Sequence, residues 1–138
     1  MKRHIKLFLV MTILLAMVAC ASSKYKIMYG VSDWYYTNHV TLQAQYDASN
    51  PEQQAWLKKN VNPYMNIMRQ LVIAMKAVDE GNMAKASQCG SEILKIATGI
   101  NYDASRMITA ITAKDYDTIL SESLALKTFI INKLTERR

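Results

Sequence analysis

Histidine, cysteine and glycine are scarce in this chain of 138 residues, and each shortage excludes a class of chemistry. Of the 2 histidines, His4 belongs to the basic first residues, and only His39 remains beyond them. A single histidine excludes most Ser-His-Asp and Cys-His catalytic arrangements and the histidine-rich zinc sites, which need several ligands. With 4 glycines, the chain has too few for a phosphate-cradling loop. We therefore expect no enzymatic activity, no cofactor and no metal.

The first residues have the pattern of an export signal. Lys2, Arg3 and Lys6 lie at the start, and residues 7–19 form an uncharged apolar run of 13 residues. A helix that crosses a bilayer needs about 20 apolar residues, whereas the core of a signal peptide needs roughly 7 to 15. The run ends in small residues, as a cleavage site requires. The sequence therefore predicts a signal peptide over residues 1–19, which takes no part in the fold.

Charge argues against nucleic acid as a partner. The whole chain has a formal charge of +6. Removal of Lys2, Arg3 and Lys6 with the signal leaves 14 basic against 11 acidic side chains, a formal charge of +3. These charges are scattered, and beyond the terminal Arg137-Arg138 they form no basic stripe of the kind that nucleic-acid binding requires. We expect no nucleic-acid partner.

The residues at the end of the apolar run, Met17-Val18-Ala19-Cys20, resemble the lipobox of bacterial lipoprotein precursors. That motif is a hydrophobic residue, a small or aliphatic one, a small one and then Cys; Met17 stands where the family most often has Leu. The resemblance implies that the Cys20 sulfur receives a diacylglycerol, that the signal is cut just before it, and that the new amino group is acylated, with fatty acids such as palmitate. It places the protein in the bacterial cell envelope, lipid-anchored to a membrane. Because Ala21 is not Asp, it favours the periplasmic face of the outer membrane in a Gram-negative cell.

Ordinary secretion is the alternative to lipidation. Ala19-Cys20-Ala21 also fits the small-x-small pattern for signal removal after Ala21, which would discard Cys20 and release a soluble product. Cys89 is the only other cysteine, so with Cys20 lipidated no intramolecular disulfide can form. No adjacent histidine or basic residue suggests a lowered thiol pKa. We expect Cys89 to be buried in a helix and unreactive.

Apolar residues recur every three or four positions beyond the anchor, which is typical of helices, and no strand-like alternation extends over a useful length. The sequence predicts an all-α fold, a small bundle of four to five helices in residues 25–138. Residues 20–24 would be the lipidated cysteine and a short tether. The expected helices run from Tyr25 to Asn50, over about 51–80, from Asn82 to Gly99, from Asn101 to Lys114, and from Asp115 onward.

Several residues mark where these helices begin and end. Asn50, Pro51 and Gln53 form the pattern of a capping box with proline at the first helical position. Because the apolar spacing continues in phase through Pro63, we expect one helix over 51–80, kinked at that proline. Gly81 is suited to a left-handed cap at its end, and Asp115 to the N-cap of the last helix.

Two helices carry clues to packing. The small residues Ala86 and Gly90 allow a neighbouring helix to approach closely. The apolar residues of the last helix cover an arc of roughly 160° at 100° per residue. So wide an arc predicts that the last helix packs in the middle of the bundle. Its apolar residues are Ile119, Leu120, Leu124, Leu126, Ile130, Ile131 and Leu134.

The aromatic run Trp34-Tyr35-Tyr36 is the candidate interaction surface. Tyr35 falls on the inward stripe of its helix, with His39 and Leu42 among the later members, and Trp34 and Tyr36 flank it. Three adjacent aromatic residues cannot all face one core, and exposed aromatic residues are favoured at interfaces. We therefore name Trp34 and Tyr36 as a possible contact with a partner or with lipid headgroups. The alternative is rim packing against a neighbouring helix.

Two functions remain open. The anchor and the lack of catalytic chemistry favour a non-enzymatic interaction or structural module that docks on another envelope protein. The alternative is a secreted or tethered bundle whose Met- and Tyr-rich core binds a small apolar ligand. Such a ligand would need a cavity of about 300 Å³ or more.

A second resemblance concerns the segment after the first predicted helix. The stretches Asn50-Pro51-Glu52-Gln53, Trp56-Leu57-Lys58 and Val61-Asn62-Pro63, behind a lipobox and an aromatic-rich helix, are similar to small helical lipoproteins encoded in prophages and mobile elements. The motifs are loose and cover a minority of the chain. The resemblance implies a host-envelope or phage-related role, but it supplies no activity and no functional residues.

Overall fold

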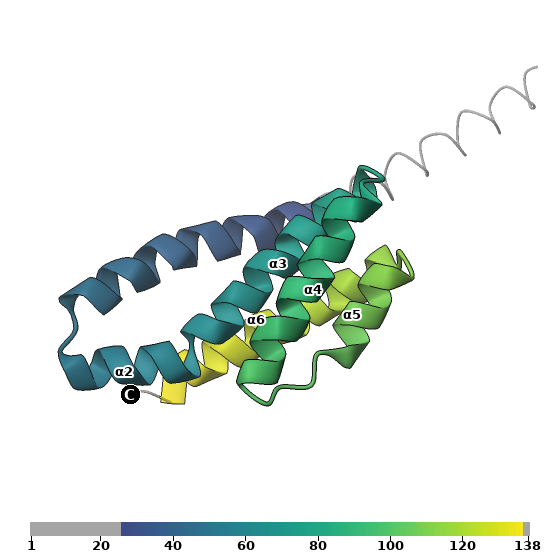
Figure 1. The fold of residues 1–138 in the computed structure, drawn as a ribbon. Coiled ribbons are helices and arrows are strands. Elements are labelled where there is room, and N and C mark those ends of the chain that lie inside the picture. Colours follow the sequence, from purple (N-terminus) through teal and green to yellow (C-terminus); the bar gives the residue numbers. More distant parts are fainter. Residues whose placement is uncertain (1–25, 137–138) are drawn as a thin grey trace, which may run out of the picture. The chain divides into compact units, whose positions relative to one another are not determined.

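The computed structural model describes residues 26–136, and these residues are helical except for short turns (Figure 1). No strand occurs among them, so the predicted all-α fold is confirmed. The first described helix covers residues 26–48, and a boundary between two compact units falls within it, after Gly30. Five helices follow: α2 (Pro51–Asn60), α3 (Asn62–Asp79), α4 (Met83–Gly99), α5 (Ser105–Thr112) and α6 (Tyr116–Glu136). The described part therefore has six helices, where four to five were predicted.

The additional helix arises because the predicted single helix over 51–80 is divided into α2 and α3. Val61, between them, has φ −124° and ψ −52°, a φ well outside the helical range. Pro63 has no N–H to donate to the Lys59 carbonyl, and its ring crowds that carbonyl. The chain stays in register across the break because the Val61 N–H still donates to the Leu57 carbonyl at 2.9 Å. The prediction of one kinked helix is therefore wrong, although the position of the disturbance is correct.

The predicted N-terminal caps are confirmed. At the start of α2, the Asn50 side chain accepts from the Gln53 N–H at 2.9 Å, and the Asn50 N–H donates to Gln53 Oε1 at 3.4 Å, with Pro51 at the first position. At the start of α6, Asp115 accepts from the Thr118 N–H at 3.2 Å and from its hydroxyl at 2.6 Å. The hydrogen bond from the Thr118 hydroxyl, together with the one from its N–H, lowers the pKa of Asp115.

Three helices end in a residue with left-handed backbone geometry. The φ values are 75° at Gly81, 53° at Asn101 and 56° at Lys114. The residue after each of these donates its backbone N–H to the carbonyl of the residue five positions earlier, which is the hydrogen bond of a Schellman motif. These bonds join Asn82 to Ala77 at 2.8 Å, Tyr102 to Ala97 at 2.9 Å, and Asp115 to Ala110 at 2.9 Å. Gly81 was predicted in this role, whereas no left-handed residue was predicted after α4 or α5.

Helix α3 is the centre of the packing in residues 31–136. It packs against α2, α4 and α6, while α5 packs between α4 and α6 (Figure 1). Its buried residues are Met65, Ile67, Met68, Leu71, Val72, Ala74, Met75 and Ala77. Met107 of α5 is buried as well, so methionine fills much of this core.

The expectation that the last helix occupies the middle of the bundle is wrong. Helix α6 buries Ile119, Leu126 and Ile130, but Leu124 and Ile131 on its outer flank are exposed. The polar residue Ser123 is fully buried on the inner side, where its hydroxyl donates to the Leu120 carbonyl at 2.7 Å. The apolar arc of α6 is therefore only partly covered.

The small residues of α4 lie in the core as expected. Ala86 and Gly90 are both buried. A Cβ built at Gly90 would lie 4.0 Å from Ile111 Cγ2 of α5, which is ordinary van der Waals contact. The neighbour at this face is therefore α5, at a distance that would also admit a methyl group.

The left-handed residue Lys114 gives a test of the turns. Glycine adopts this geometry without the steric cost that a side chain meets, so Lys114→Gly should raise the free energy of unfolding by about 0.5–1 kcal/mol. Gly81→Ala is the matched reverse change, because no atom lies within 4 Å of the added Cβ and the cost is confined to the backbone; we expect a loss of about 1 kcal/mol. Urea unfolding followed by circular dichroism measures both. An unchanged midpoint for both variants would contradict the assigned backbone geometry.

Candidate interaction surface

One face of the helix over residues 31–48 is buried. Val31, Tyr35 and Leu42 form this face, and the Tyr46 carbonyl accepts from Gln54 Nε2 of α2 at 2.9 Å. Tyr35 and Leu42 belong to the predicted inward stripe. His39 was expected on the same stripe but is exposed, with its ring stacked on Tyr35 at a centroid distance of 5.7 Å.

Tyr35 is the central side chain of this buried face. Its burial raises the pKa of the phenol, and Arg69 of α3 opposes that effect only in part. The ring also meets the ring of Tyr36 edge-on, with centroids 5.1 Å apart. Tyr35 therefore lies buried on the inward face of the helix, with the rings of Tyr36 and His39 against it.

The two residues named as a surface differ in their surroundings. Trp34 is half-buried, and Lys127 Nζ of α6 lies 5.6 Å from its ring centroid, a cation–π contact. Tyr36 is 55% exposed. The structure therefore puts Trp34 at a helix–helix contact, as the rim-packing alternative described, and leaves Tyr36 open. Binding by either residue stays a prediction.

Val40 is a further exposed residue that the sequence analysis did not identify. Its side chain is 69% exposed. It follows Tyr36 by four positions, so the two side chains are neighbours on one side of the helix. A single valine off the inward stripe gives no signal in the sequence, since isolated exposed aliphatic residues are common. We call Tyr36 and Val40 the outer patch.

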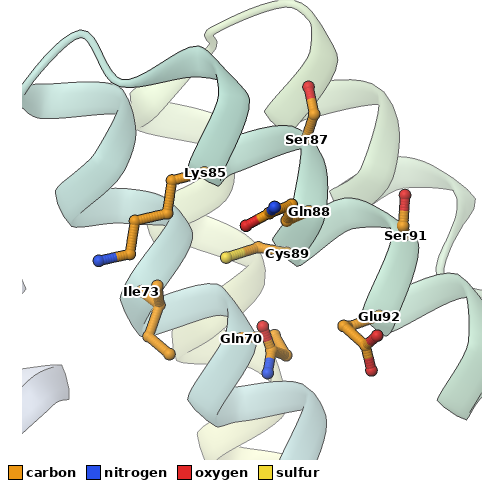
Figure 2. Close-up of a pocket in the computed structure, with 8 residues that line it drawn as sticks. All are labelled: Gln70, Ile73, Lys85, Ser87, Gln88, Cys89, Ser91 and Glu92. Atoms are coloured by element: carbon orange, nitrogen blue, oxygen red, sulfur yellow. The ribbon is translucent and has the colours of Figure 1, made fainter.

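A shallow hollow lies between α3 and α4 (Figure 2). Its volume is about 560 Å³, and it is open to solvent. Most of its lining residues are of polar types, although their apolar atoms contribute most of the surface that faces the hollow, and the exposed Lys85 and Glu92 lie seven residues apart along α4. The lining also includes Gln70 and Ile73 of α3 and Gln88 and Cys89 of α4. A hollow that is open to solvent does not match the enclosed interior cavity expected for an apolar ligand.

Cys89 points its sulfur towards the space between the helices in Figure 2. The residue is a free cysteine and only 3% exposed, so the prediction of a buried thiol is confirmed. Burial raises its pKa, and the nearby charge of Lys85 opposes this without outweighing it. A thiol with a raised pKa forms little thiolate near neutral pH and is a weak nucleophile.

Other kinds of site were sought in the same residues. Within 26–136, no group of three or more histidine, cysteine or acidic side chains is placed to hold a metal ion. None of the helices described is both long and apolar enough to cross a membrane. Cys20 and the signal peptide predicted over residues 1–19 lie outside the described residues.

Comparison with known proteins adds no relative. No protein-family model, no curated protein and no solved structure matches this chain.

The Cys89 thiol can be tested by alkylation. In a Cys20→Ser variant it is the only thiol, and we expect its reaction with N-ethylmaleimide at neutral pH to be slow in the folded protein and fast in urea. Leu94→Cys on the same helix is the matched control, because Leu94 is 56% exposed. The control thiol should react at least about tenfold faster than Cys89. Equal rates in the folded protein would contradict the burial of Cys89.

Proposed function

We propose that this protein is a bacterial lipoprotein: a helical bundle tethered to a cell-envelope membrane through Cys20, where it acts as a non-enzymatic interaction or structural module. The observation that carries the proposal is the sequence Met17-Val18-Ala19-Cys20 directly behind a 13-residue apolar run. Burial of each CH₂ group contributes about 0.8 kcal/mol, and two or more acyl chains anchor a protein stably. The folded residues then need no lipid-binding segment of their own to stay at the membrane.

The surface proposed for a partner is the outer patch. Tyr36 and Val40 keep most of their side-chain area in water, on the side of their helix away from Val31 and Leu42. Tyrosine is enriched among the residues that dominate protein–protein affinity, because it buries a large rigid ring and retains a polar tip. The supported partner is another protein of the envelope, which would cover this patch.

The membrane and the biological context are part of the same proposal. Ala21 in place of Asp favours the periplasmic face of the outer membrane if the cell is Gram-negative. The similarity of residues 50–63 to prophage-type lipoproteins favours a phage-related role in the host envelope. The other candidate function, binding of a small apolar ligand, gains no support from the hollow between α3 and α4, because the hollow is open to solvent and does not enclose a ligand.

The anchor is tested by metabolic labelling with a fatty acid in a bacterial host. The full-length precursor should incorporate label and gain the mass of a diacylglyceryl group, while Cys20→Ser should lose the label completely. Cys89→Ser is the matched control, since it removes the other cysteine and should label normally. Label that persists in Cys20→Ser would disprove lipidation at this residue, and an unlabelled product beginning at Ser22 would support ordinary secretion.

The outer patch is tested by site-specific photocrosslinking in living cells. A photoreactive phenylalanine analogue at position 36 should give a discrete adduct with an envelope protein, whereas the same analogue at position 94, which is also exposed, should not. Val40→Ser should reduce that adduct about tenfold if the residue is central to the contact. Because Val40 is exposed, its replacement should change the free energy of unfolding by no more than about 0.5 kcal/mol. Equal adducts at positions 36 and 94 would count against a specific partner at the patch.

A further inference from the structure

The start of the first described helix exposes basic and apolar side chains together. Ile27 is 44% exposed, Tyr29 is 76% exposed, and Lys26 is exposed beside them. Tyrosine and lysine share a property that suits a membrane surface: each has an apolar body and a polar tip that stays in water. An isoleucine next to them adds purely apolar area. This combination is the one expected of residues at the level of lipid headgroups.

The charged residues after Cys20 are at first only basic, and acidic residues begin further along the helix. Lys24 and Lys26 follow Cys20, and the first acidic residue after Cys20 is Asp33. A lysine close to an anionic bilayer strengthens binding about fivefold, whereas a carboxylate is repelled. Asp33 and Asp47, both exposed, make the rest of this helix a poor surface for anionic lipid. The favourable region is therefore confined to the helix start.

The position of the anchor brings the bilayer within reach. Residues 21–25 separate Cys20 from Lys26, and a fully extended chain between those two residues spans at most about 20 Å. A lipidated Cys20 would itself lie at the membrane surface. Contact of the first helical turn with headgroups is then an intramolecular event at high effective concentration, so a small surface suffices.

We propose that Lys26, Ile27 and Tyr29 rest on the headgroups of an anionic lipid bilayer. This inference depends on the proposed anchor at Cys20 and names a second contact with the same membrane. It also separates the roles of the first helix: its start contacts lipid, and the outer patch at Tyr36 and Val40 stays available to a protein.

The test measures the depth of a nitroxide on the acylated mature protein in vesicles of phosphatidylethanolamine and phosphatidylglycerol. The label is attached at Tyr29→Cys, with Cys89→Ala removing the other thiol. The matched position is Leu94→Cys on α4, which is exposed in the folded protein. Collisions with a water-soluble nickel complex report access from water. We expect position 29 to lose nickel access relative to position 94, with collisions with oxygen retained.

Charge reversal supplies the second variant. Lys26→Glu should restore nickel access at position 29 on these anionic vesicles, because it replaces attraction to the headgroups by repulsion. Equal nickel access at positions 29 and 94 in the protein that retains Lys26 would overturn the contact. Shielding at position 29 that Lys26→Glu leaves unchanged would also overturn it, because the protein itself would then cover the position. Co-flotation with the vesicles measures attachment of the protein to the membrane, and so tests the anchor at Cys20 independently of nickel access. If the protein floats with the vesicles but position 29 is not shielded, the anchor at Cys20 is supported and the headgroup contact is wrong. If the protein does not float, both are wrong.

Discussion

The burial of α3 is the constraint on which the packing of residues 31–136 depends. Eight of its side chains are buried, and the helix is bordered by α2, α4 and α6. Full burial of a Leu, Ile or Met side chain contributes about 1.5–3 kcal/mol. Leu71 and Met75, both without exposed surface, lie on the face where neighbouring helices meet. Helices α2, α4 and α6 therefore each cover part of the apolar surface of α3, and α5 packs in turn on α4 and α6.

The parts of the fold that follow from local chemistry could be predicted from the sequence. Asn50 with Gln53, and Asp115 with its following turn, cap helices because their side chains satisfy free N–H groups within three residues. Gly81 ends a helix because it alone enters left-handed geometry without steric cost. Asn101 adopts the same geometry, which asparagine tolerates better than most residues, and Lys114 adopts it against its intrinsic preference. We attribute the left-handed geometry of Lys114 to the packing of the helices on either side of the turn. No pattern of neighbouring residues in the sequence reveals that packing.

Non-local packing also explains the two errors of arrangement. The apolar period passes through Pro63 unchanged, so the sequence could not show that Val61 leaves helical geometry to let α2 and α3 follow separate directions. The apolar arc of α6 predicted contacts on a wide side, but α3 and α5 cover only its inner part and leave Leu124 and Ile131 exposed. A pattern of apolar residues indicates which side chains can be buried. The number of neighbouring helices determines which of them are buried in the fold.

The candidate surface was predictable only in part, for a geometric reason. Neighbouring residues in a helix point about 100° apart, so three consecutive aromatic rings must diverge. That argument distinguishes Tyr35 from its neighbours, and the structure buries Tyr35 and exposes Tyr36. It could not assign Trp34, because the contact with Lys127 joins residues that are far apart in the chain. Val40 completes the outer patch without any feature in the sequence that marks it.

The methionines of the core have a consequence for durability. Met68, Met75 and Met107 are at most 2% exposed. Conversion of a thioether to the sulfoxide makes it polar and disrupts apolar packing, so peroxide can damage this interior only when the helices separate. Every such oxidation would leave a bulky polar group on α3 or α5, where the helices must pack together again. The protein's lifetime under oxidative stress is therefore set by how often its helices open, and the accumulated sulfoxide would record the frequency of that opening.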